Sequence, residues 1–266
     1  MIRLSIILQI LKKSISQPKL LRDIIEERSQ IQNDEIHKMH TYSYDFSSID
    51  DFFKIKFPNA ELSKYELELK QLEEYVTKFT KNLETKKFPS KEKPYPLDYS
   101  LNAESRKFLY FLCRILKPMN IVETGVAYGL SSYYILNALE KNECGKLHSI
   151  DSIFRPWQTE KMIGAVIPDS LKTRWNLILG KSTEKLNVTL DDFDEIDIFI
   201  HDSLHTYQNM MFEFNTAFKK INENGMIVSD DVLGNDSFHD FNNQKNTSNH
   251  LIRVNEGTGL GIILKN

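Results

Sequence analysis

A short glycine loop is the first stretch of this chain whose residue types suggest chemistry. Residues 121–132 run from an apolar segment into the loop and then into a helical pattern. Gly125 permits a turn with positive φ, and the small residues Ala127 and Gly129 let a ligand approach backbone N–H groups at a helix N-terminus. The spacing departs from the dinucleotide fingerprint G-x-G-x-x-G. The stretch predicts a cofactor loop.

Three carboxylates form a second group, at the ends of two expected strands. Asp202 ends an apolar run that starts at residue 196, and Asp230 and Asp231 end another that starts at residue 225. Because ligands of open α/β sheets bind beyond the carboxyl ends of the strands, we expect these side chains to converge. A divalent cation that prefers oxygen ligands would relieve their mutual repulsion. Capping of the following helix and turn is the alternative.

Two further side chains belong with these groups. His205 lies three residues past Asp202 and is the candidate general base, because imidazole accepts a hydroxyl proton near neutral pH. We count Asp202 with it as catalytic. Asp151 lies 26 residues past Gly125, at the tip of the next expected strand, where a carboxylate reaches the ribose hydroxyls of a bound nucleoside. A helix cap is the alternative for Asp151.

The elements that position these residues alternate along the second part of the chain. Expected strands cover 119–123, 146–151, 175–180, 196–202 and 225–231, with helices between them, including one over 157–166. Such alternation indicates βαβ units and a parallel sheet. Strands over 250–254 and 259–264, with four residues between them, form an antiparallel pair. The predicted fold is α/β and Rossmann-like, mostly parallel with an antiparallel C-terminal strand.

The pattern of the first part of the chain predicts a helical N-terminal extension. Helical patterns cover 2–11, 19–40 and 61–86, whereas the aromatic-rich stretch 41–58 reads as irregular. Three prolines among charges at 88–96 break the pattern. We therefore expect a boundary that separates region 1–96, a lid or oligomerisation element, from a cofactor-binding domain over 97–266. A chain that begins near Tyr99 should then fold by itself.

Composition limits the class of protein. The 266 residues are 41% hydrophobic and 27% charged, with a net charge of −3, so a sizeable core is expected and nucleic acid is not an expected partner. Two cysteines far apart in the sequence argue against a disulfide framework and fit the cytoplasm. The apolar start is too short to span a membrane.

The order of the elements resembles the class I S-adenosylmethionine (SAM) methyltransferase fold, a seven-stranded sheet. Three motifs support the resemblance: Val-Glu-Thr-Gly-Val-Ala-x-Gly-x-Ser-Ser from residue 122, His-Asp-Ser-x-His-x-Tyr from 201, and Ser-Asp-Asp from 229. They are similar to motifs of the small sugar and antibiotic O-methyltransferases, the Methyltransferase 24-like family. The resemblance runs from about residue 100 to the end.

This resemblance implies SAM as cofactor and assigns residues to it. Glu123 would pair with the methionine ammonium of SAM, unless it only holds the loop. The expected cofactor-binding set is Glu123, Gly125, Ala127, Gly129, Ser131, Asp151, Ser152, Gly180, Ser182 and Asp202. In the similar enzymes, aspartates corresponding to Asp202, Asp230 and Asp231 bind Mg²⁺ or a similar ion such as Mn²⁺, although metal-free members exist.

The sequence thus predicts a SAM-dependent methyltransferase that methylates a hydroxyl of a sugar or small polyol, with divalent-metal assistance as an option. A homo-oligomer through the N-terminal helices is an open alternative to a lid. An NAD-binding oxidoreductase fits less well, because the third glycine is missing and the terminal strand pair is unexplained. A non-catalytic SAM- or nucleotide-binding module is the other alternative, against which the retained Asp202, His205, Asp230 and Asp231 speak.

Overall fold

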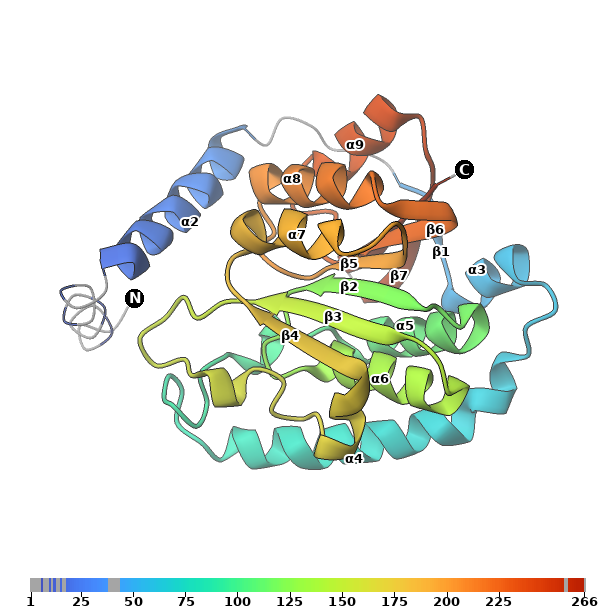
Figure 1. Ribbon diagram of the computed structural model, residues 1–266, viewed down its shortest axis with the longest axis horizontal. Helices are drawn as coiled ribbons and strands as arrows, with labels where there is room; N and C mark the ends of the chain where they lie inside the picture. The colour runs from blue at the N-terminus through green and yellow to red at the C-terminus, as the bar shows by residue number, and fades with distance from the viewer. Residues whose placement is uncertain are drawn as a thin grey trace.

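A computed structural model of the chain shows a twisted eight-stranded sheet between helical layers (Figure 1). The structure describes residues 18–37, 44–255 and 258–265, together with Ile6, Ile10, Lys12 and Ile15. Most of the predicted helix over 2–11 therefore lies outside the described residues. No helix in the described part of the chain is both long and apolar enough to cross a membrane.

The sheet is mostly parallel, as predicted, and its one antiparallel strand is β8, which pairs with β6 and β7. The edge next to β7 carries a two-residue strand that the sequence did not predict, so the sheet has eight strands and not seven. In spatial order the strands are β1 (Phe46–Ser47), β7 (Ser248–Asn255), β8 (Thr258–Leu264), β6 (Ile221–Ser229), β5 (Ile196–His201), β2 (Asn120–Thr124), β3 (Lys146–Asp151) and β4 (Trp175–Leu179).

Helices cover both faces of this sheet (Figure 1). One face packs against α5 (Ala103–Leu116) and α6 (Leu130–Asn142), and the other against α7 (Ser182–Asp191), α8 (Tyr207–Phe218) and α9 (Ser237–Lys245). Ile121 and Val122, adjacent on β2, belong to the hydrophobic clusters on opposite faces. This alternation explains why the central strands are apolar throughout. Parallel strands with helical crossovers bring their carboxyl ends to one edge, where the predicted site residues lie.

The N-terminal region contributes two kinds of element. α3 (Ile49–Lys56) and α4 (Glu66–Glu84), the latter preceded by the 3₁₀ turn η1 (Leu62–Tyr65), share the hydrophobic cluster that contains α5, α6 and one face of the sheet. α2 (Pro18–His37) instead stands beside the carboxyl ends of the strands (Figure 1). Among the described residues, no α2 side chain belongs to a hydrophobic cluster.

Two local predictions are wrong. The stretch 41–58, predicted as irregular, contains β1 and α3 in its described part, because Ser48 caps α3 and Phe52 and Phe53 pack into the core. The stretch 157–166 holds only a short 3₁₀ turn, η3 (Glu160–Met162), and not a helix. Its backbone follows the glycine loop instead: Gly164 N–H donates to the Ala127 carbonyl and Val166 N–H to the Tyr128 carbonyl.

Candidate active site

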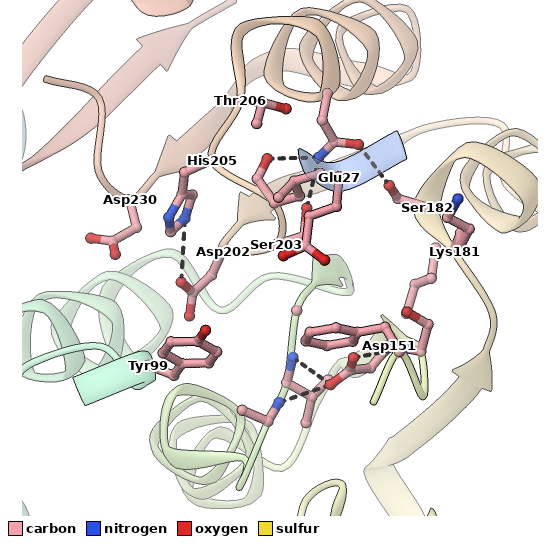
Figure 2. A pocket seen from close by; sticks show the side chains of 18 of the residues that line it. Glu27, Tyr99, Asp151, Lys181, Ser182, Asp202, Ser203, His205, Thr206 and Asp230 are labelled. Carbon is pink, nitrogen blue, oxygen red and sulfur yellow. Dashed lines mark hydrogen bonds and ion pairs between the residues drawn. The ribbon is translucent and has the colours of Figure 1, made fainter. Parts of the chain in front are cut away.

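A cavity of about 650 Å³ opens at the carboxyl ends of the parallel strands (Figure 2). Its walls come from the loops after β2, β3, β4, β5 and β6, from α2, and from the segment before α5. Of the residues predicted from the sequence, the following line it: Gly125, Ala127, Asp151, Ser152, Gly180, Ser182, Asp202, His205, Asp230 and Asp231. The fold therefore gathers both predicted groups around one space.

The glycine loop touches the strand that carries Asp202. Gly125 has φ of +85°, and a Cβ there would come within 1.9 Å of the Asp202 carbonyl oxygen. Only glycine therefore allows the loop after β2 and the loop after β5 to pack this closely. Ala127 also has a positive φ, of 47°. The sharp turn leaves the N–H groups of residues 126 and 127 facing Asp151.

Asp151 is held at the tip of β3 by the backbone of this loop. Its Oδ2 accepts hydrogen bonds from Val126 N at 3.1 Å and Ala127 N at 2.8 Å, and its Oδ1 accepts one from Ser152 N at 2.6 Å (Figure 2). Burial raises the pKa of Asp151, and these backbone donors oppose that shift. The carboxylate faces the cavity with unused lone pairs, as a sugar-hydroxyl acceptor requires.

Glu123, Gly129 and Ser131 do not line the cavity. Glu123 is fully buried, and its two carboxylate oxygens accept hydrogen bonds from the hydroxyls of Ser131, Ser132 and Ser149. Burial raises the pKa of Glu123, and the serine hydroxyls oppose the shift. In this arrangement Glu123 and Ser131 join the start of α6 to β2 and β3. The geometry matches the loop-holding alternative for Glu123.

Asp202, His205 and Asp230 converge on the opposite side of the cavity (Figure 2). One ligand atom from each lies within 4.8 Å of the others. His205 Nε2 is 3.7 Å from Asp202 Oδ1, and it is buried without a hydrogen-bond partner in the described part of the chain. Two carboxylates and one imidazole are a donor set that suits Mg²⁺ or Mn²⁺ as well as other divalent ions.

Asp231 stands outside this cluster, although the sequence grouped it with Asp202 and Asp230. Its Oδ2 lies 3.7 Å from His205 Nδ1, the ring nitrogen opposite the one that faces Asp202. Its φ of 49° turns the chain directly after Asp230, and its side chain is 46% exposed. The third member of the cluster in the structure is therefore His205, beside Asp202 and Asp230.

The electrostatics of the cluster favour a bound cation. Burial raises the pKa of Asp202 well above its usual range, and the nearby charge of Asp230 adds to the effect. Burial and the charge of Asp231 raise the pKa of Asp230 to about 6. Burial and the neighbouring His201 lower the pKa of His205 to about 3, so its ring is neutral at physiological pH. A neutral imidazole is the form that binds metals, and a cation would offset the repulsion between the aspartates.

The comparisons with known proteins cover the part of the chain that builds this site. Residues 122–232, from the glycine loop to the end of the acidic motif, match a family model described as a methyltransferase domain. This stretch of the chain is a methyltransferase domain, as the resemblance predicted. The match covers the glycine loop, Asp151 and the whole acidic cluster. No curated protein matches the chain.

Solved structures share the fold of this methyltransferase at low sequence identity. An O-methyltransferase from Bacillus cereus in complex with SAH is 16% identical with a TM-score of 0.55, covering 82% of this chain and 97% of that chain. The O-methyltransferase TomG from Streptomyces achromogenes, in complex with SAM, is 17% identical with a TM-score of 0.53 (81% and 95%). A putative caffeoyl-CoA O-methyltransferase from Staphylococcus aureus is 15% identical with a TM-score of 0.52 (82% and 97%).

The methyltransferase also contains a buried polar network that the sequence analysis missed. Glu213 on α8 is fully buried and accepts hydrogen bonds from Thr124, Ser203 and Asn209. His201 Nδ1 lies 2.6 Å from Glu213 Oε2, and its ring packs edge-on against His205, with ring centres 5.3 Å apart. His201 therefore packs against α8. In the sequence Glu213 is one of several polar residues in this helix, and nothing there sets it apart.

The second missed feature is the wall that α2 builds. It contributes Asp23, Glu26, Glu27, Gln30 and Ile31 to the cavity. Polar contacts attach it to the loops of the methyltransferase: Lys181 pairs with Asp23 at 3.0 Å and Glu26 at 2.8 Å, Arg155 pairs with Glu27 at 2.8 Å, Thr206 Oγ1 donates to Gln30 Oε1 at 2.6 Å, and Tyr207 N donates to Asp34 Oδ2 at 2.8 Å. The sequence analysis predicted only a helix over 19–40 and gave none of its residues to the cavity.

Proposed function

We propose that the protein transfers the methyl group of SAM to a hydroxyl oxygen of a small, uncharged acceptor, with a divalent cation held by Asp202, His205 and Asp230. The observation that carries the proposal is the convergence of these three side chains across the cavity from Asp151 and the glycine loop. The O-methyltransferases among the structural neighbours agree with this reaction class.

Different residues of the chain would bind the cofactor and the acceptor. Asp151 and the loop around Gly125 hold the nucleoside end of SAM, and the sulfonium activates the methyl group without help from the protein. The acceptor oxygen must then lie in line with the S–CH₃ bond and lose a proton. A divalent cation, when bound, supplies Lewis acidity that lowers the pKa of this hydroxyl. Asp202 and Asp230 provide the negative ligands that such an ion requires.

His205 fits two roles that use the same nitrogen atom. As a neutral ring it binds a cation through Nε2, and Nδ1 faces Asp231. Without a cation, Nε2 is the nitrogen that would take the proton from the hydroxyl of the substrate. This is the general-base role predicted from the sequence. Its low pKa makes it a weak base near neutral pH, so the ligand role is the better use of its position.

The charge of the cavity limits the acceptor. Among the described residues, seven that line it carry a carboxyl group, and Lys181 is the one amine: the acids are Asp23, Glu26, Glu27, Asp151, Asp202, Asp230 and Asp231. SAM and a divalent cation offset only part of this negative charge. An anionic acceptor would be repelled, whereas the hydroxyls of a sugar or small polyol match the many hydrogen-bond acceptors.

We assign α2 as a lid over the cavity. It lines the cavity and is attached to the methyltransferase by ion pairs and hydrogen bonds. Such contacts open at a lower free-energy cost than a packed core. A lid of this kind would exclude water during methyl transfer and then let the product leave.

Chelation combined with a binding measurement tests the proposal. Excess EDTA should abolish transfer to neutral polyol acceptors, and Mg²⁺ or Mn²⁺ should restore it, while calorimetric binding of SAM is unchanged. Full activity in the chelator would remove the cation from the mechanism. Activity on anionic acceptors, such as sugar phosphates, that equals activity on their neutral counterparts would contradict the acceptor class.

A further inference from the structure

The segment between α4 and α5 forms one wall of the cavity and includes the 3₁₀ turn η2 (Leu97–Tyr99). Two of its hydroxyl groups, Tyr95 Oη and Ser100 Oγ, are buried and have no hydrogen-bond partner within the described part of the chain. Burying a hydroxyl without a partner costs free energy, so such groups mark positions where a ligand or water completes the bonding. The cavity-lining residues of this wall are Tyr95, Tyr99, Ser100, Leu101 and Asn102.

Packing and hydrogen bonds hold Tyr95 in place. The residue is 1% exposed, and its ring packs edge-on against that of Tyr128, with centres 5.1 Å apart. Its N–H donates to Tyr128 Oη at 3.2 Å, and its carbonyl accepts from the same hydroxyl at 2.8 Å. The Trp157 indole donates to the neighbouring Pro94 carbonyl at 3.0 Å. Because Tyr128 belongs to the glycine loop, these contacts tie Tyr95 to the loop that holds the cofactor.

The surroundings keep the phenol of Tyr95 protonated. Burial raises its pKa, and the negative charge of Asp151 raises it further. The hydroxyl is therefore a hydrogen-bond donor over the whole physiological range. Asp151 accepts hydrogen bonds from the N–H groups of Val126, Ala127 and Ser152 and forms none with Tyr95. Tyr95 and Asp151 thus line the same cavity, close enough for the charge of the carboxylate to act on the phenol, and no hydrogen bond joins them.

We propose that Tyr95 is a cofactor-binding residue whose phenol donates a hydrogen bond to the ribose diol of SAM, beside the bond that Asp151 accepts from the same diol. A ribose hydroxyl both donates and accepts, and a carboxylate can only accept. A complete site for the diol therefore needs a donor next to Asp151, and Tyr95 supplies it. The inference rests on the proposed role of Asp151 in holding the nucleoside.

This role gives Tyr95 an unusual signature. In the empty protein its hydroxyl stabilises nothing, so Tyr95→Phe should leave the stability of the empty protein unchanged or raise it. In the complex the same hydroxyl makes a hydrogen bond, so Tyr95→Phe should weaken binding of S-adenosylhomocysteine by about 3- to 10-fold. A purely structural tyrosine would show the reverse pattern.

The experiment compares two tyrosines by calorimetry and urea unfolding. Tyr110 is the matched control, because it is fully buried, lies outside the cavity, and donates its hydroxyl to Glu68 Oε2 at 2.5 Å. Tyr110→Phe should lower the stability of the empty protein and leave the affinity for S-adenosylhomocysteine unchanged. Tyr95→Phe should do the opposite. A Tyr95→Phe protein that is less stable when empty, or fails to fold, overturns the inference.

Two further outcomes separate this inference from the function on which it rests. Wild-type protein that does not bind S-adenosylhomocysteine would refute the proposed function itself. Wild-type protein that binds it, with Tyr95→Phe binding equally well, overturns the role of Tyr95 alone. The weaker binding caused by Tyr95→Phe should disappear with one of two analogues of S-adenosylhomocysteine, the 2′-deoxy or the 3′-deoxy form, namely the one that lacks the hydroxyl bonded to Tyr95. An equal loss with both analogues would overturn the ribose contact.

Discussion

His205 Nε2 lies 3.7 Å from Asp202 Oδ1, and this distance places the imidazole inside the acidic cluster. The opposite nitrogen, Nδ1, lies at the same distance from Asp231 Oδ2. A metal-binding histidine whose second nitrogen faces a carboxylate is held in one orientation and in one tautomer. Asp230 lies in the cluster on the Nε2 side and is a direct ligand in our proposal. Asp231 lies beside the opposite nitrogen, and we propose that it orients the ring.

This separation predicts different losses of metal affinity. Asp230→Asn should remove measurable Mn²⁺ binding, because a charged ligand is lost. Asp231→Asn should weaken Mn²⁺ binding by about 10- to 100-fold, because only the orientation of His205 is relaxed. Calorimetric titration with Mn²⁺ measures both, and Asp169→Asn on the exposed turn η4 (Asp169–Arg174) is the control. Equal losses in the two variants would restore Asp231 to the ligand set.

The contrast between Asp231 and His205 shows which parts of the site the sequence could predict and which it could not. The ends of β5 and β6 were predictable from their apolar runs, and so was the gathering of carboxylates at one edge of the sheet. The backbone turn at Asp231, with its positive φ, was not predictable, because neighbouring aspartates look equivalent in a sequence. The return of the loop after β5, which brings His205 beside Asp202, depends on contacts with α2 and Glu213.

The N-terminal region shows the same limit. The apolar stripe of α4 was predictable from its spacing, but its partners on α5 and α6 were not. Likewise α2 shows a charged pattern with no indication that Asp23, Glu26 and Glu27 face Lys181 and Arg155, more than a hundred residues away. Contacts between distant parts of a chain are set by tertiary packing, and one sequence contains no signal that pairs them.

The raised pKa of Asp230 predicts a stability gain in a variant that loses function. Its pKa is about 6 in the fold and near the ordinary 3.8 when unfolded. The folded state therefore resists ionisation, so the empty protein loses stability as the pH rises from about 4 to 6 and carries the full penalty above 6. Asp230→Asn should raise the free energy of unfolding by about 1–3 kcal/mol at pH 7.5 and by less than half as much at pH 4.5.

Urea unfolding at the two pH values, in EDTA, measures this difference. Asp169→Asn is again the control, because Asp169 is fully exposed and its charge is satisfied by Lys172. An Asp230→Asn protein that is no more stable than wild type at pH 7.5 would show that the repulsion in the cluster is weaker than the geometry implies.

The ion pairs of Lys181 predict how the lid responds to charge removal. Lys181→Met keeps most of the side chain but removes its bonds to Asp23 and Glu26. Partly exposed pairs of this kind contribute little each, so bound S-adenosylhomocysteine should leave about 2- to 5-fold faster. The double variant Asp23→Asn, Glu26→Gln should show the same change. Stopped-flow release measures both, with Lys172→Met as the control.

Salt gives an independent check on the lid. Release from the wild type should accelerate with NaCl, whereas Lys181→Met and the double variant should respond less. If Lys181→Met accelerates release and the double variant does not, Lys181 contacts the cofactor directly and its pairing with α2 does not control the lid.

The last prediction concerns which N-terminal elements the sheet needs. The domain boundary expected at residue 96 stays a prediction. The packing leads us to expect a boundary between α2 and α3 instead. Phe52, Phe53 and Leu72 belong to the same hydrophobic cluster as Phe108 and Phe111 of α5. Each buried side chain of this size contributes about 1.5–3 kcal/mol to the free energy of unfolding. Loss of α3 and α4 would therefore remove more than the whole net stability of a typical domain.

A chain that begins at Tyr44 should therefore fold and bind SAM but transfer methyl groups poorly, because it lacks only residues 1–43, which include α2. A chain that begins at Tyr99 should be insoluble or lack cooperative unfolding, because the faces of α5 and α6 that α3 and α4 cover become exposed. Circular dichroism, urea unfolding and SAM calorimetry on both chains decide the matter. A cooperatively folded chain from Tyr99 that binds SAM would confirm the boundary at residue 96 and show that α4 is an appendage.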